Sequence, residues 1–218
     1  MKLMIVDDHQ VVRQGIANLL SSMLPAVAIT EIENGLDAVS RYGELRPDVV
    51  LLDMGLPDIS GLEVGRRIRL RWRGAAILFF TMHDELPMVR QALDVGGLGF
   101  VSKSCAPEEL AEAVKRVASG QPYIEHPVAT RLAMNHERAV DHRLRDMTQR
   151  EMEVLLMYAR GESVSAIADR LCVSNKTVSN HLAILKSKLQ VSSSVELIHL
   201  AVDAGLIRYG HLEGSRRV

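Results

Sequence analysis

The sequence predicts a parallel α/β domain followed by a smaller all-α domain, and three observations lead to this fold class. Residues 49–52 are four consecutive aliphatic side chains, so they lack the alternation of a half-exposed strand and indicate a strand buried on both faces. Strand-like and helix-like segments alternate five times over residues 2–118. From residue 148 onward, the periodic segments have helical spacing only.

The expected elements of the first domain follow one another with short connections. Strands are expected at residues 2–6, 27–32, 49–52, 76–81 and 98–102, and helices at about 12–20, 35–45, 62–71, 86–95 and 107–118. The last of these helices begins at Pro107, a residue that suits the first helical turn. Repeated strand–helix units of this kind favour a five-stranded parallel sheet with helices on both faces.

The chain changes character after Gly120. Residues 121–147 contain two prolines, three histidines and interleaved charges, which indicates a linker, with a short helix expected near Val128 to His136. Residues 1–120 have three more acidic than basic side chains, whereas residues 121–218 have two more basic than acidic. We therefore expect a first domain at 1–120, a linker at 121–147 and a second domain at 148–218.

Composition excludes several classes of protein. No apolar run approaches the ~18 residues of a membrane span, and the amino-terminal apolar stretch meets acidic residues too soon for a signal sequence. We expect a cytoplasmic protein that does not contact membranes. The two cysteines, Cys105 and Cys172, lack the spacing of metal ligands, so we expect reduced thiols and neither a disulfide nor a zinc site.

Polar side chains follow four of the five expected strands. Asp7 and Asp8 follow the first strand, Asp53 the third, Thr81 ends the fourth and Lys103 follows the fifth. Because carboxyl ends of parallel strands meet at one edge, these side chains are expected to converge there. Clustered carboxylates repel one another unless a cation neutralises them, and hard oxygen ligands suit Mg²⁺. A hydroxyl and an ammonium group are suited to holding phosphoryl oxygens, and a carboxylate can form an aspartyl phosphate.

Residues 1 to about 120 resemble the receiver domain of response regulators, which has a flavodoxin-like fold. The matching residues are the pair Asp7–Asp8, the stretch Leu51–Pro57 with Gly61, the strand end Phe80–Thr81, and Gly99–Lys103. The resemblance implies that Asp53 accepts a phosphoryl group from a sensor histidine kinase. The sequence departs from the family pattern at Met82, where a small residue is common, and at Ser104, where proline is common.

The resemblance also implies the roles of the surrounding residues. Mg²⁺ would be held by Asp8, Asp53 and the backbone carbonyl of Gly55, with Asp7 assisting. The phosphate would be contacted by Thr81 and Lys103. Phe100 occupies the position of the family's switch aromatic, for which ordinary core packing is the alternative reading.

The second domain begins with clear helix signals. Thr148 and Glu151 form a capping-box pattern, and Ser163 and Ser174 are suited to capping the next two helices. In the third helix, the apolar residues Val178, Leu182, Leu185 and Leu189 fall on one face. The opposite face is cationic and without acid, which suits a DNA major groove, although a solvated helix face is the alternative.

Residues 148–207 resemble the LuxR-type helix-turn-helix domain of NarL/FixJ-type regulators. The shared positions are Thr148–Glu151, Glu153–Leu155, Gly161, Ile167–Ala168, Leu171, Val173–Ser174, Thr177–Val178, His181, Lys188–Leu189 and Gly205–Ile207. By position and exposure, Ser179, Asn180 and Ala183 are expected to face base edges. The residues expected to contact DNA phosphates are Lys176, Thr177, Lys186 and Lys188. Because Ser194 stands where the family often has arginine, one domain should bind weakly, and a homodimer would compensate.

Together these features predict a two-component transcriptional regulator whose phosphorylation at Asp53 promotes dimerisation and binding to double-stranded DNA. It would be an enzyme only toward its own phosphorylation and dephosphorylation. One alternative is a DNA-binding regulator with a silent receiver, which Met82 makes plausible. A remote alternative is a phosphohydrolase with an aspartyl nucleophile, but such an enzyme needs a second aspartate where Gly55 stands.

Overall fold

The computed structural model describes residues 1–82, 85–134, 144, 147–204 and 206–207. The chain divides into two compact units, Met1–His136 and Glu137–Val218. Within the described ranges, no helix is both long enough and apolar enough to cross a membrane.

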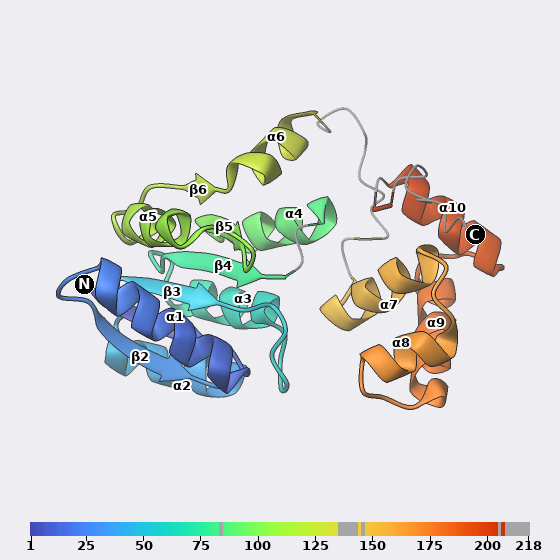
Figure 1. The fold of residues 1–218 in the computed structure, drawn as a ribbon, viewed down its shortest axis with the longest axis horizontal. Coiled ribbons are helices and arrows are strands. Elements are labelled where there is room, and N and C mark those ends of the chain that lie inside the picture. Colours follow the sequence, from blue (N-terminus) through green and yellow to red (C-terminus); the bar gives the residue numbers. More distant parts are fainter. Residues whose placement is uncertain (83–84, 135–143, 145–146, 205, 208–218) are drawn as a thin grey trace, which may run out of the picture. The chain divides into compact units, whose positions relative to one another are not determined.

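The first unit is built on a six-stranded parallel sheet (Figure 1). The strands are β1 (Lys2–Val6), β2 (Ala28–Ile32), β3 (Val49–Leu52), β4 (Ile77–Thr81), β5 (Gly99–Ser102) and β6 (Tyr123–Ile124). Their order across the sheet is β2-β1-β3-β4-β5-β6. The five strands expected from the sequence are confirmed, with ends that differ by one residue at most. The sixth strand was not predicted.

Helices cover both faces of this sheet, as the strand–helix alternation predicted (Figure 1). The helices of the first unit are α1 (Gln10–Met23), α2 (Gly35–Leu45), α3 (Gly61–Arg71), α4 (Leu86–Asp94), α5 (Pro107–Ala118) and α6 (His126–Met134). On one face, α1 and α5 pack against side chains that include Leu3, Leu51 and Val101. On the other face, α3 lies so close to the sheet that a Cβ on Gly65 would be 3.1 Å from the ring of Phe79 in β4. All residues of β3, β4 and β5 are buried, which is why their sequences do not alternate.

The segment that was expected to be linker contributes to the first unit. Residues 121–134 form β6, which pairs with β5, and α6, which packs against α4. The helix expected near Val128 to His136 is therefore α6, although residues 135–136 lie outside the described ranges. A two-residue strand is too short to produce a periodic signal, so the sequence could not separate it from a linker.

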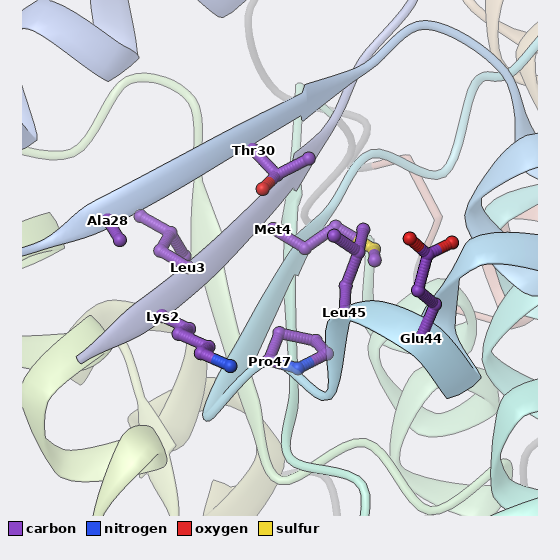
Figure 2. A pocket seen from close by; sticks show the side chains of 8 residues that line it. All are labelled: Lys2, Leu3, Met4, Ala28, Thr30, Glu44, Leu45 and Pro47. Atoms are coloured by element: carbon purple, nitrogen blue, oxygen red, sulfur yellow. The ribbon is translucent and has the colours of Figure 1, made fainter.

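One small open pocket lies at the amino-terminal edge of this sheet, near the end of α2 (Figure 2). Its lining consists of Lys2, Leu3, Met4, Ala28, Thr30, Glu44, Leu45 and Pro47. The pocket has a volume of about 240 Å³, which is below the ~300–1,000 Å³ of usual small-molecule sites. It lies at the opposite edge from the polar residues that follow the strands.

The second unit contains four described helices, α7 (Gln149–Ala159), α8 (Val164–Arg170), α9 (Asn175–Lys188) and α10 (Ser194–Asp203). The capping box at Thr148 and Glu151 is present, and Ser163 and Ser174 cap α8 and α9 through their side chains. The turn between α8 and α9 places Cys172 in the left-handed region, at φ +52°. The apolar stripe predicted on α9 is confirmed, since each of its four residues is at most 8% exposed.

Candidate functional site

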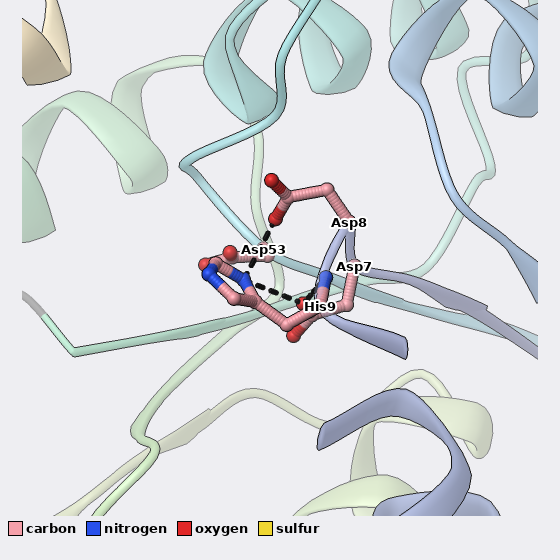
Figure 3. A group of neighbouring side chains, drawn as sticks. All are labelled: Asp7, Asp8, His9 and Asp53. Atoms are coloured by element: carbon pink, nitrogen blue, oxygen red, sulfur yellow. Dashed lines mark hydrogen bonds and ion pairs between the residues drawn. The ribbon is translucent and has the colours of Figure 1, made fainter. Parts of the chain in front are cut away.

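The strand order reverses between β1 and β3, because the chain leaves β1 to form β2 on one side and returns to form β3 on the other. At the carboxyl ends of these two strands, the backbone amide of Asp53 donates to the carbonyl of Val6 at 2.9 Å. This bond fixes the end of β3 beside Asp7 and Asp8 (Figure 3). The convergence of these carboxylates follows from the topology, as the sequence predicted.

Lys103 completes the cluster from the end of β5. Its Nζ lies 2.6 Å from Asp7 Oδ2 and 3.0 Å from Asp53 Oδ2, and all three side chains are less than 10% exposed. The backbone amide of Lys103 donates to the carbonyl of Thr81 at 2.8 Å, which aligns the ends of β4 and β5. The structure thus brings residues from β1, β3, β4 and β5 to one edge of the sheet.

The electrostatics of this cluster follow from burial and pairing. Burial raises the pKa of the Asp53 carboxyl above its ordinary value, and the nearby Lys103 ammonium only partly opposes this effect. Burial alone would lower the pKa of Lys103, but the neighbouring carboxylates of Asp53 and Asp7 together have the larger effect, so the pKa of Lys103 is raised overall. Lys103 is therefore a permanent cation at neutral pH, placed where it can attract an anionic group to Asp53.

The loop after β3 holds the Asp53 side chain in one orientation. Its Oδ1 accepts a hydrogen bond from the Met54 amide at 2.8 Å, and the Met54 carbonyl in turn accepts one from the Gly61 amide at 2.9 Å. A Cβ on Gly61 would lie 2.0 Å from the Asp53 carbonyl oxygen, so only glycine permits this approach. Gly55 lies in the same loop and is half-buried.

Two neighbours of the acidic cluster were not predicted from the sequence. His9 Nδ1 lies 2.8 Å from Asp8 Oδ1 and 3.4 Å from Asp7 Oδ1 (Figure 3). One potential ligand atom from each of Asp7, Asp8, His9 and Asp53 falls within a group spanning 4.8 Å, as a single metal ion requires. Arg13 donates from Nη1 to the Asp7 carbonyl at 2.6 Å. Because Arg13 lies on α1, no local pattern in the sequence indicated this contact.

The remaining residues predicted for this site occupy defined positions. Thr81 is fully buried at the end of β4, and Phe100 is fully buried in β5, beside Phe79 in the sheet register. The side chain of Met82 is 68% exposed. It therefore extends into solvent beside the site and is not packed into the core as a gap filler.

The residues of α9 that are predicted to contact DNA differ in how far they are exposed to solvent. Lys176, Ser179, Asn180 and Ala183 are exposed, whereas Thr177, Lys186 and Lys188 are half-buried. The helix has no acidic residue in its first turn and has Lys186 and Lys188 in its last turn. The exposed members lie opposite the buried apolar stripe, as a helix that docks on another surface requires.

Lys188 has a partner that was not predicted. Its Nζ lies 2.8 Å from Glu151 Oε2, the same oxygen that accepts the Thr148 amide of the α7 capping box at 2.7 Å. Burial alone would raise the pKa of Glu151, but the hydrogen bonds from Lys188 and Thr148 outweigh it and lower that pKa. Lys188 therefore ties the end of α9 to the start of α7.

Comparison with known proteins matches both parts of the chain to families. Residues 3–115 match the response regulator receiver domain, and residues 145–201 match the bacterial regulatory proteins of the luxR family. These matches confirm both resemblances that the motifs indicated.

Relatives match along nearly the whole chain. The chain is 48% identical over 211 residues to the transcriptional activator protein ExaE of Pseudomonas putida, with 95% of this chain and 99% of that protein covered. It is 35% identical over 205 residues to response regulator UvrY of Escherichia coli, with 93% and 94% covered. The solved structure of the Salmonella typhimurium RcsB response regulator is 25% identical, with a TM-score of 0.56 over 93% of this chain and 98% of that chain. The chain therefore belongs to the response regulators that join an amino-terminal receiver domain to a carboxyl-terminal luxR-type DNA-binding domain.

Proposed function

We propose that Asp53 is the phosphoacceptor of this response regulator and that its phosphorylation promotes dimerisation and binding to double-stranded DNA. The observation that carries the proposal is the placement of Lys103, whose ammonium group bridges Asp7 and Asp53 at 2.6 and 3.0 Å. A cation held beside a buried carboxylate is suited to receiving an anionic phosphoryl donor. Aspartate carboxylates are known to form covalent phosphoryl intermediates.

The donor set at this site fits Mg²⁺. Asp8, Asp53 and the Gly55 carbonyl would hold the ion, with Asp7 assisting, because hard oxygen ligands and room for water are what Mg²⁺ prefers. When bound, the ion would neutralise charge on the phosphoryl oxygens. Asp8 is suited to this role because its side chain is 31% exposed and so reaches both the cluster and solvent.

Three further receiver residues have proposed roles. Thr81 and Lys103 would contact the phosphoryl oxygens, and both are held at the same edge of the sheet by the bond between the Lys103 amide and the Thr81 carbonyl. Phe100 would be the switch aromatic: it is completely buried in β5, and in the sheet register it pairs with Phe79, two residues before Thr81 on β4.

In the second unit, α9 would be the recognition helix. Ser179, Asn180 and Ala183 would face base edges, since all three are exposed. The proposed phosphate contacts are Lys176, Thr177, Lys186 and Lys188. Of these, Lys188 would contribute partly through its ion pair with Glu151, which orients α9. The related regulator RcsB has been solved as a complex with DNA, which supports this use of the domain.

The partners follow from the two domains. A sensor histidine kinase would supply the phosphoryl group, and the active species would be a homodimer on DNA in the cytoplasm. Functionally, we assign a receiver domain to residues 1–120, a linker to 121–147 and a DNA-binding domain to 148–218, while residues 121–134 pack on the receiver. We propose that the chain transforms no separate substrate and catalyses only its own phosphorylation and dephosphorylation.

The test uses the full-length protein before and after treatment with acetyl phosphate and Mg²⁺. Sedimentation velocity would report its oligomeric state, and selection from a random-sequence duplex pool would report DNA binding. We expect the treated wild type to dimerise and to enrich a sequence motif, and Asp53→Asn to do neither. If the wild type and Asp53→Asn enrich the same motif equally well, the receiver is silent and the proposal is wrong.

A further inference from the structure

The carboxyl end of β5 carries Lys103, so whatever fixes this strand end also fixes the ammonium group in the site. On one side, β5 is held by β4 through the bond from the Lys103 amide to the Thr81 carbonyl, at 2.8 Å. On the other side, its neighbour is β6, which has only two residues and pairs only with Gly99 and Phe100. The strand therefore runs two residues beyond its partner, and the amide of Ser102 faces the edge with no strand beside it.

Glu125 satisfies that amide with its side chain. Its own backbone amide makes the last ladder bond, to the Phe100 carbonyl at 3.1 Å. Its backbone carbonyl accepts the Ala129 amide at 2.9 Å and so belongs to the first turn of α6. Because the Glu125 carbonyl is used in this way, it cannot accept the next bond of the β5–β6 ladder. The side-chain oxygen Glu125 Oε2 accepts the Ser102 amide instead, at 2.8 Å.

This contact is buried and specific. Glu125 is 9% exposed and Ser102 is 7% exposed, so a Ser102 amide that lost this acceptor would have little access to water. The carboxyl group lies near Cys105 as well, where it helps raise the pKa of that thiol, although burial is the larger cause. The turn that follows is closed by a bond from the Cys105 amide to the Ser102 carbonyl at 3.0 Å.

We propose that Glu125 is a positioning residue for phosphorylation of Asp53, acting through Lys103. The inference rests on the proposed role of Asp53. Glu125 holds Ser102, Ser102 is covalently joined to Lys103, and Lys103 must reach the phosphoryl oxygens. Because a displacement of about 1 Å in a reacting group can cost ~10²-fold in rate, loosening this strand end should slow phosphoryl transfer. The same residue directly precedes α6 and its carbonyl accepts the Ala129 amide, so it also links the site to the helix that packs against α4.

The test measures the rate at which the full-length protein gains one phosphoryl group from acetyl phosphate with saturating Mg²⁺, by intact mass. We expect Glu125→Ala to slow this rate about ten-fold, and Glu125→Gln, which keeps an acceptor oxygen, to slow it by less than about three-fold. Glu112→Ala is the matched control, since Glu112 is an exposed carboxylate on α5, and its rate should equal that of the wild type. Thermal melting of each variant checks that it is folded.

A double-mutant cycle separates positioning from a general structural effect. If Glu125 acts through Lys103, then adding Glu125→Ala to a Lys103→Gln background should change the remaining rate by less than about two-fold. An equal ten-fold loss in that background would overturn the inference, as would a Glu125→Ala rate equal to that of Glu112→Ala. Failure of the wild type itself to gain a phosphoryl group would instead refute the proposed function.

Discussion

Adding a single methyl group at Gly61 tests how tightly the phosphoacceptor loop is constrained. The Cβ of Gly61→Ala would lie 2.0 Å from the Asp53 carbonyl oxygen, 2.8 Å from Met54 Cα and 2.9 Å from the Asp53 carbonyl carbon. All three are backbone atoms, so no side chain can rotate away to make room. The substitution must therefore displace either the start of α3 or the backbone of Asp53.

The size of the effect follows from that overlap. An ordinary contact begins near 3.4 Å, so something must move by about 1.4 Å. Overpacking of this kind costs about 1–3 kcal/mol in the free energy of unfolding. For a domain of this size, that lowers the melting temperature by roughly 4–12 °C. A displacement of about 1 Å at the reacting carboxylate would slow phosphorylation by ~10²-fold.

The assay compares melting temperature and phosphorylation by acetyl phosphate in wild type, Gly61→Ala and Gly15→Ala. Gly15 is an exposed residue of α1, and a Cβ there would meet nothing within 4 Å. Gly15→Ala should stabilise the protein by about 0.5–1 kcal/mol through helix propensity and leave the phosphorylation rate unchanged. A Gly61→Ala protein that melts and is phosphorylated like the wild type would refute the argument that this close approach fixes Asp53.

Three further predictions concern thiols, pH and DNA. Burial and two nearby glutamates raise the pKa of Cys105 to about 11. Iodoacetamide at pH 8 should therefore label the exposed Cys172 in the folded protein and leave Cys105 unlabelled until the protein is denatured. Peptide mass mapping would show which cysteine carries the label. Because the pKa of Glu151 is lowered overall, its ionised form stabilises the folded protein at pH values above its ordinary pKa of 4.5, and this stabilisation is lost as the pH falls toward the lowered pKa. In calorimetric melting, the melting temperature of Glu151→Gln should therefore fall less between pH 6 and pH 3 than that of the wild type. Asn180→Ala should weaken binding to a selected duplex by about 1–3 kcal/mol and relax base preference at one position, measured by fluorescence anisotropy, whereas an equal loss on all duplexes would contradict base reading.

The parts of the fold that were predictable have strong local signals. Four consecutive aliphatic residues predicted β3 because a strand buried on both faces cannot alternate. Thr148, Ser163 and Ser174 predicted three helix starts because each satisfies an amide that the helix itself leaves free. The cluster at the sheet edge was predictable as well, because parallel topology alone brings the strand ends together.

Most of the parts that were missed depend on contacts between residues that are distant in the sequence. The ion pair of Lys188 with Glu151 joins residues 37 positions apart, so the spacing of residues on α9 could not reveal it. The contact of Glu125 with Ser102 spans 23 positions and depends on where β6 stops, which a two-residue strand does not reveal. One exception is Arg13, which lies six positions from Asp7 on the face of α1 that buries Ile16, Ala17 and Leu20. Only the folded chain shows that its guanidinium group donates to the Asp7 carbonyl.

The most direct test of the central claim is the intact mass of wild type and Asp53→Asn after incubation with acetyl phosphate, with and without Mg²⁺. The proposed chemistry predicts one added phosphoryl group in the wild type, dependent on Mg²⁺, and none in Asp53→Asn. An adduct that forms equally in Asp53→Asn would place the phosphoacceptor elsewhere. An adduct that forms equally well without Mg²⁺ would contradict the role proposed for Asp8 and Gly55.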